Sequence, residues 1–307
     1  MRKIIFAGNL PQQYRLTTVP KQLDGQYVNE LHERRMWAQA QKDKTTDLTP
    51  DDIHYKTNAF GFRCDEFTAS DAPAVMFTGC SLTFGDSLPL QDVWAHRVYS
   101  KLKKNVDRDL RYINLGRPGG SIDHVVRSTI AFGNSYNPAI VVGLLPPVAR
   151  TEYYGAPGHI VDILPAISDD LKHERRNDFN GESHLSIAAI EDSLLADEYF
   201  HAYRTAKNLQ MLDLFRQATG CEMLLSTWVQ LEDLCRHFDD DFSHLFIKET
   251  FSLHPEWPAD VLGAKAVACK AAMDGIHPGP MHHEAFAHIM YPYVEAALKQ
   301  QLAKSHQ

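Results

Sequence analysis

From residue 73 onward, short apolar runs alternate with longer segments whose apolar residues recur at helical spacing. The apolar runs predict strands at 74–78, 111–115, 138–145 and 221–228. The segments beside them predict helices at 92–104, 121–131, 194–218 and 281–301. Asp92 and Ser121 suit the starts of their helices, and Pro292 should bend the last helix or end its first half. Continuous apolar strands separated by helices indicate a mostly parallel sheet that is covered on both faces.

Residues 1–70 are less regular, and we expect them to form an N-terminal extension packed on a core domain at 71–303. Within the extension, residues 4–7 favour a short strand, 26–41 a helix with a weak apolar face, and 43–52 a polar turn. Residues 155–193 are rich in Asp, His, Arg and Asn, which suggests an insertion or a lid over the carboxyl ends of the strands.

Two remote segments carry the candidate chemistry. Residues 79–85 read Gly-Cys-Ser-Leu-Thr-Phe-Gly, which places Ser81 on a glycine-flanked turn just after the first predicted strand. Asp274 lies three residues before His277, at the entrance to the last helix. A serine hydroxyl becomes a good nucleophile when a base removes its proton and a third group orients that base. The two segments supply all three groups.

These segments resemble blocks I and V of the SGNH/GDSL hydrolases, and residues 112–119 resemble block II. Residues 57–63 resemble a lead-in found in some members, so that the likeness spans about residues 57–290. The resemblance implies a flavodoxin-like three-layer α/β/α fold and ester hydrolysis without metal or cofactor. It further implies that Ser81 is the nucleophile, His277 the base and Asp274 its acidic partner. The backbone N–H groups of Ser81 and Gly119 would form the oxyanion hole.

The chain departs from the family pattern at two places. Cys80 replaces the block I aspartate, which is not a member of the triad. Pro146 and Pro147 follow the third predicted strand, where block III offers an asparagine to the oxyanion. One missing oxyanion donor can cost about 10²–10³ in rate. Arg150 is the first candidate to replace it in contacting the substrate.

Other residues admit competing interpretations. Cys80 can be a nucleophile, although a cysteine beside glycine after a buried strand is more often a small buried residue. His124 can contact substrate, although a surface position on its helix is the simpler expectation. The histidines at 277, 282, 283 and 288 suggest a metal, but His283 and His288 are one residue too far apart for HExxH, and solvated helix positions explain them better. The acidic run 239–241 lacks calcium-loop spacing and indicates a solvated turn.

The formal net charge of −8 argues against nucleic acid as the main partner. The five cysteines are odd in number and contain no CxxC pair, so neither a disulfide framework nor a zinc site is expected. The apolar run at residues 4–7 is too short for a signal peptide, and no run is long enough to span a membrane. A cytoplasmic protein is the default expectation, and a virion-associated protein would have the same features.

Three functions follow from these observations. The first is a serine esterase acting on a small-molecule or glycan ester, such as a carbohydrate O-acetyl group. The second is an acyltransferase on the same scaffold, which passes the acyl group to a sugar hydroxyl. The third is a catalytically weak glycan-binding or structural protein, motivated by the missing asparagine. The sequence leaves the substrate and the oligomeric state open.

Overall fold

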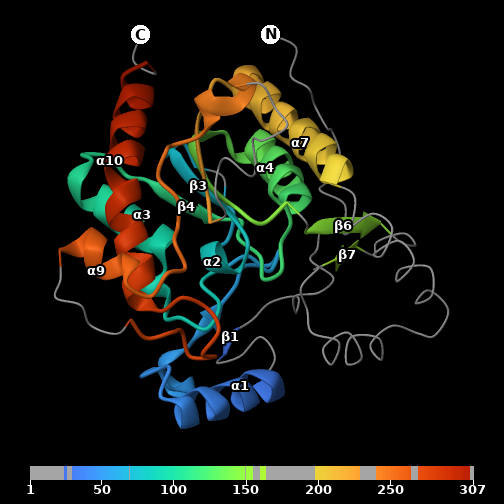
Figure 1. Ribbon diagram of the computed structural model, residues 1–307. Helices are drawn as coiled ribbons and strands as arrows, with labels where there is room; N and C mark the ends of the chain where they lie inside the picture. The colour runs from blue at the N-terminus through green and yellow to red at the C-terminus, as the bar shows by residue number, and fades with distance from the viewer. Residues whose placement is uncertain are drawn as a thin grey trace.

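A computed structural model describes residues 24–25, 30–68, 70–148, 150–154, 160–163, 198–228, 240–263 and 269–304 (Figure 1). The strands are β1 Asp24–Gly25, β2 Tyr55–Lys56, β3 Ala74–Gly79, β4 Arg111–Asn114, β5 Pro138–Leu145, β6 Thr151–Tyr154, β7 Ile160–Ile163 and β8 Glu222–Thr227. The α-helices are α1 Glu30–Asp43, α2 Ser81–Phe84, α3 Trp94–Asn105, α4 Ile122–Tyr136, α7 Glu198–Thr219, α9 Trp257–Leu262 and α10 Pro280–Lys304. Three 3₁₀ helices are η2 Pro50–Asp52, η3 Leu90–Asp92 and η4 Asp240–Leu245.

The central sheet has four described strands in the order β4-β3-β5-β8, and every neighbouring pair is parallel. In chain order these are the second, first, third and fourth strands, which is the order of flavodoxin-like sheets. Backbone bonds extend the edge, because Ile247 donates to the Leu225 carbonyl and Phe251 to the Thr227 carbonyl. The strand order reverses between β3 and β5, and ligands of such sheets bind outside the carboxyl ends of the strands at this point.

Helices cover both faces of the sheet, giving the three-layer α/β/α architecture (Figure 1). One face packs against α3 and α10 through a core cluster that includes Trp94, Phe286 and Val294. The opposite face packs against α4 and α7 through a second cluster that includes Phe132 and Leu212. The two inner strands, β3 and β5, are buried almost throughout because they have helices on both sides, and this explains their mostly apolar sequences.

The four predicted strands are confirmed, each within a residue or two at its ends. The predicted helices correspond to α3, α4, the described part of the 194–218 segment in α7, and α10. Ser121 caps α4 as expected, because its hydroxyl accepts a hydrogen bond from the His124 backbone N–H at 3.2 Å. The helix α10 continues through Pro292 and does not end there.

Asp92 lies just before α3, which begins at Trp94, but it does not cap this helix. Asp92 lies in η3, and its carboxylate pairs with Arg97 at 2.6 Å. The first N–H of α3, on Trp94, instead donates to Nδ1 of His283 at 3.1 Å. These two residues are 189 positions apart, so a tertiary contact replaces the local cap that the sequence suggested.

The described part of the N-terminal region includes α1 at 30–43, within two to four residues of the predicted helix. Tyr55 and Ile53 form a small core cluster with Phe84 of α2 and with Met273. The Thr45 carbonyl accepts a hydrogen bond from the Ala271 N–H at 2.7 Å. Residues 40–55 therefore contact both segments that carry the candidate chemistry.

Some expectations lie outside the described residues. They are the strand at 4–7 and almost all of the insertion at 155–193, of which only β7 is described. The strand β7 pairs antiparallel with β6. In the described ranges, each helix is either too short or too polar to cross a lipid bilayer.

Candidate active site

Ser81 is the first residue of α2 and directly follows the turn that ends β3. The turn requires glycine at position 79, where φ is +155° and a Cβ would lie 2.2 Å from Thr83 Oγ1 and 2.7 Å from the Leu144 carbonyl oxygen. This tight reversal brings Ser81 to the carboxyl edge of the sheet beside the β3–β5 reversal point. The Ser81 residue is 7% exposed.

Cys80, the residue before Ser81, is fully buried in the core cluster beneath α3 and α10. Its Sγ lies 4.0 Å from the Ser81 hydroxyl oxygen. The interpretation of Cys80 as a small buried residue is therefore confirmed. Such a thiol fills space that the aspartate of block I would have to occupy as a buried carboxylate.

Asp274 and His277 form a close pair on the loop before α10. The ring nitrogen Nδ1 of His277 lies 2.5 Å from Oδ2 of Asp274. The other carboxylate oxygen accepts the backbone N–H groups of Ile276 and His277, both at 3.0 Å. With Nδ1 facing a carboxylate, the proton of the neutral ring is held on Nδ1 and Nε2 is left as the basic nitrogen.

Electrostatics favour the charged forms of this pair. Burial opposes a charge on His277, but the hydrogen bond and charge of Asp274 and the charge of Asp86 outweigh it and raise the pKa of His277 to about 9. Burial also opposes ionisation of Asp274, but the His277 ring and the two backbone N–H groups lower the pKa of this carboxyl. The His277 ring is therefore a stronger base than an ordinary histidine.

Two contacts hold the Asp274–His277 loop against the segment that begins with Ser81. The Met273 N–H donates to the Ser87 carbonyl at 3.0 Å, and the Met273 side chain packs in the cluster that contains Phe84 of α2. Asp86, five residues after Ser81, is influenced by the charges of Asp274 and His277, and its own charge raises the pKa of His277. Among the described hydrogen bonds, however, none joins the Ser81 hydroxyl to His277. Catalytic hydrogen bonds are often long before a substrate binds.

The loop after β4 packs directly on the Ser81 turn. The Arg117 N–H donates to the Gly79 carbonyl at 3.2 Å, and a Cβ on Gly116 would lie 2.5 Å from the Phe84 backbone nitrogen. Gly119 lies in the same loop, with φ at +72°. The loop predicted to carry an oxyanion donor thus lies beside the predicted nucleophile.

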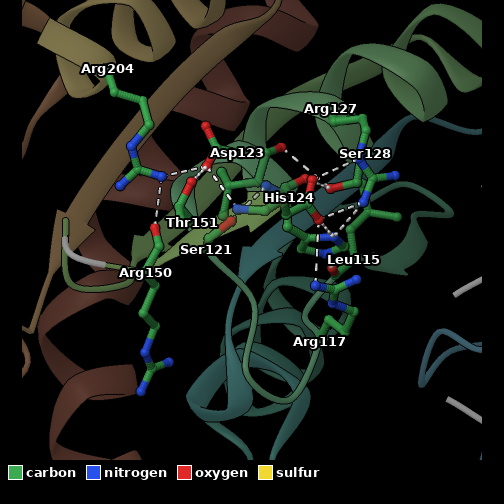
Figure 2. A network of polar contacts seen from close by, with 12 residues as sticks. Leu115, Arg117, Ser121, Asp123, His124, Arg127, Ser128, Arg150, Thr151 and Arg204 are labelled. Carbon is green, nitrogen blue, oxygen red and sulfur yellow. Dashed lines mark hydrogen bonds and ion pairs between the residues drawn. The ribbon is translucent and has the colours of Figure 1, made fainter. Parts of the chain in front are cut away.

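A buried polar network holds the Gly119 loop on the side of α4 (Figure 2). His124 Nε2 lies 3.0 Å from the Leu115 carbonyl oxygen, and Arg127 approaches the opposite ring nitrogen at 3.4 Å. The side chain of Glu152 is fully buried and pairs with Arg127 at 2.7 Å and with Arg117 at 3.4 Å. The network therefore links the loop to α4 and β6.

The expectation of a surface His124 is wrong, because the residue is fully buried. Burial and the neighbouring Arg117 and Arg127 charges keep the pKa of His124 well below its ordinary value, so the ring is neutral at pH 7. Its contacts are to the Gly119 loop, and this favours a structural role. Helical periodicity could not show that Glu152, far along the chain, covers this face of α4.

Of the histidines expected to be solvated, His288 is exposed, but His282 and His283 at the start of α10 are buried. His283 is 1% exposed, and burial followed by the charges of His282, His277 and Arg97 lowers its pKa to about 3. Its neutral ring accepts the Trp94 N–H described above. His282 is 6% exposed and contacts the His254 carbonyl at 3.3 Å. Within the described ranges, no three His, Cys, Asp or Glu side chains gather as metal ligands would.

Two residues near the site were not predicted from the sequence. Asp86 faces the Asp274–His277 pair, and its hydroxyl partner Tyr55 lies 3.3 Å away. Arg63, in the lead-in segment, is 1% exposed and donates to the carbonyls of Gly85 at 2.6 Å and Leu88 at 2.8 Å. The lead-in therefore fixes the chain just after α2. The sequence offered one sign of Asp86: it is the acidic residue that directly follows Gly85.

A scan against models of protein families finds no match, and neither does a search of curated proteins. Solved structures do match. Esterases, a GDSL-like lipase and an acylhydrolase are among them. TesA is 15% identical over 73% of this chain and 99% of its own, with a TM-score of 0.41. The GDSL-like lipase from Parabacteroides merdae is 12% identical over 75% and 98%, with a TM-score of 0.40. The acetyl xylan esterase AlAXEase is 15% identical over 72% and 99%, with a TM-score of 0.40. With TM-scores near 0.4, these matches do not by themselves assign a function. The fold class is supported by the strand order, and the candidate site by its own contacts.

Gly275, between Asp274 and His277, should not tolerate alanine. Its φ is +73°, and an added Cβ would lie 2.6 Å from the Cβ of Ala40 in α1. We expect Gly275→Ala to lower the free energy of unfolding by about 2–4 kcal/mol, because backbone strain and overpacking add. The matched control is Gly263→Ala, where φ is +61° but nothing lies within 4 Å, so that only the strain is present. Equal losses in chemical denaturation would show that Ala40 does not restrict the loop.

The charge around His277 should be visible in a pH profile. If His277 is the general base, its unprotonated form is the active one, and because its pKa is about 9, kcat/KM should rise with pH up to about that value. Asp86→Asn removes a charge that raises this pKa, and the rise should then move to lower pH. The profile of ester hydrolysis against pH checks both statements. A midpoint that stays in place in Asp86→Asn would contradict the role given to Asp86.

Proposed function

We propose that this chain is a serine hydrolase that cleaves a carboxylic ester, such as an O-acetyl group on a carbohydrate, through an acyl-enzyme on Ser81. The observation that carries the proposal is the 2.5 Å Asp274–His277 pair, on a loop bonded to the segment that begins with Ser81. A carboxylate that fixes a histidine in one tautomer is the arrangement that activates a serine hydroxyl.

In the acylation step, His277 Nε2 takes the proton of the Ser81 hydroxyl as Oγ attacks the ester carbonyl. The bond to the alcohol breaks, and the protonated His277 ring gives its proton to the departing oxygen. Asp274 stabilises the ring while it is positively charged. In deacylation, water attacks the acyl-enzyme with His277 again acting as base, and Ser81 recovers its proton. General base catalysis of this kind contributes about 10²–10⁴ in rate.

The negative oxygen formed in both steps needs donors on the opposite side of the carbonyl. The backbone N–H groups of Ser81 and Gly119 are the proposed donors. The packing of the Gly119 loop on the Gly79 turn supports this assignment, because it brings the two backbone segments side by side. Donors fixed in advance in a partly buried site stabilise such an oxyanion strongly.

The test is hydrolysis of p-nitrophenyl acetate, followed by product analysis with an acetylated glycan. A hydrolase releases acetate into water, whereas an acyltransferase on the same scaffold would pass the acetyl group to an added sugar acceptor. Absence of turnover with both substrates, together with absence of labelling by a fluorophosphonate probe, would leave the non-catalytic glycan-binding function as the better account.

A further inference from the structure

The Arg150 side chain is partly buried, and the described residues provide no counter-ion for its guanidinium. Its Nη1 is buried and makes no hydrogen bond, and no described carboxylate lies within ion-pair distance of the side chain. Figure 2 shows this side chain extending away from the polar network that holds its own backbone. Removing a charge from water without a partner is costly, so such groups are usually paired in the folded protein or await a ligand.

The position of Arg150 is fixed by its backbone. Its carbonyl accepts a hydrogen bond from Arg204 Nη1 at 2.9 Å, and Arg204 Nη2 also donates to the Val148 carbonyl. Arg204 is in turn paired with Asp123, at the start of α4, at 2.5 Å. The loop after β5 is therefore clamped between α4 and α7, and it presents the Arg150 side chain at the carboxyl edge of the sheet.

Trp228 gives the guanidinium a rigid support. The Arg150 Cζ lies 5.3 Å from the centre of the Trp228 ring, and Trp228 is the residue directly after β8. The Trp228 Nε1 is also buried without a hydrogen-bond partner. Two N–H donors thus remain unsatisfied where β5 and β8 end. The Arg150 charge acts to lower the pKa of His277, which shows that the cation is close enough to influence the catalytic pair.

Arg150 packs on Trp228, and Trp228 follows a strand that is not adjacent to those leading to the proposed oxyanion donors. Ser81 follows β3 and the Gly119 loop follows β4, whereas Trp228 follows β8 on the other side of β5. Adjacent strands are about 4.8 Å apart, so the ends of β3 and β8 are separated by roughly 10 Å. That distance suits a second group of the substrate better than its reacting carbonyl.

We propose that Arg150, supported by Trp228, forms a subsite that binds a carboxylate carried by the ester substrate, so that the enzyme selects acidic esters. The inference rests on the proposed esterase function. A guanidinium matches a carboxylate because its planar fork donates two parallel hydrogen bonds, and Trp228 Nε1 offers a third donor. The chain has a net charge of −8, so preference for an anionic substrate requires a local cation of this kind.

The kinetic test compares kcat/KM for two pairs of charged and neutral esters. Mono-4-nitrophenyl succinate against 4-nitrophenyl pentanoate places the carboxylate on the acyl side, and 3-acetoxybenzoate against 3-acetoxybenzamide places it on the alcohol side. We expect the wild type to prefer the charged member of one pair. Arg150→Met should abolish that preference through a 10–100-fold rise in KM for the charged ester, since charge-assisted hydrogen bonds contribute about 1.5–3 kcal/mol. The exposed Lys207→Met is the control for net charge.

Two kinetic results would overturn the subsite. Equal losses of kcat for charged and neutral esters in Arg150→Met would identify Arg150 as an oxyanion donor. Absence of any preference in the wild type would show that no carboxylate is selected.

A binding test separates this inference from the proposed function. Ser81→Ala is titrated calorimetrically with succinate and with benzoate, and the titration is repeated with Ser81→Ala/Arg150→Met. Binding to the first variant, reduced 10-fold or more in the second, supports the subsite even if no ester is ever hydrolysed. Failure of both anions to bind Ser81→Ala contradicts it, even if the esterase activity is established.

Discussion

Ser81→Ala should reduce the hydrolysis of p-nitrophenyl acetate by about 10⁴-fold or more, because loss of the proposed nucleophile would remove the covalent route entirely. The same variant should fail to react with a fluorophosphonate probe, which modifies activated serines. The rate that remains would come from water attacking an ester held near the oxyanion donors. Steady-state kinetics and mass spectrometry of the labelled protein check both expectations.

The adjacent Cys80 offers a matched control for that experiment. Cys80→Ala removes a fully buried Sγ next to the proposed nucleophile and leaves the Ser81 hydroxyl in place. We expect it to lower the free energy of unfolding by about 1 kcal/mol, through a small cavity, while labelling persists. The opposite pattern, with labelling lost in Cys80→Ala and retained in Ser81→Ala, would transfer the role of nucleophile to the thiol.

Asp274→Asn should also cost about 10⁴ in kcat at neutral pH. An asparagine of the same shape either presents its NH₂ to Nδ1 or loses the hydrogen bond, and the His277 ring is then held in the wrong tautomer. In the wild type, the pKa of His277 is about 9. It should fall in Asp274→Asn because the variant lacks the carboxylate that stabilises the charged ring. The activity that remains should therefore depend on pH over a lower range. Asp260→Asn, an exposed carboxylate in α9, is the control.

The Asp274–His277 pair should contribute to stability within a defined pH window. The pKa of His277 is raised on folding, so its contribution is complete below about pH 6.5, the unfolded value, and is lost as pH rises through about 9. The pKa of Asp274 is lowered, so its contribution is present above the unfolded value and is lost in acid. In denaturant titrations, Asp274→Asn should therefore differ most from the wild type between these limits. A difference that does not vary with pH would show that the pair does not couple to folding.

The core of the fold was predictable because its strands are buried on both faces. A strand such as β5 has no polar side, so its sequence is an unbroken apolar run that stands out without an alignment. The catalytic candidates were predictable for a related reason. Gly79 is required by a turn that leaves no room for a Cβ, and Asp274 and His277 pair through local spacing. Each of these signals lies within a few residues.

The errors arose where a partner came from a distant part of the chain. His283 looked like a helix surface residue because the Trp94 N–H that it binds belongs to another helix. His124 looked exposed because two of the residues around it come from other parts of the fold, Glu152 from β6 and Arg117 from the loop after β4. Asp92 was expected to favour the start of α3, but the first N–H of that helix, on Trp94, is bonded to His283 instead. Periodicity reports which face of a helix is apolar, but it cannot report which polar groups are satisfied by tertiary contacts.

The seating of the 269–279 loop has a consequence for biosynthesis. This loop bonds to Thr45 and packs beside Ala40 on one side, and Met273 bonds to Ser87 on the other. Ser81 emerges from the ribosome long before its proposed base, and both supports of the loop are already present when the loop arrives. On the proposed mechanism, a nascent chain that has finished the central sheet carries Ser81 without its base until residues 269–304 dock. Catalytic activity would then appear only after this last segment has docked on the rest of the domain.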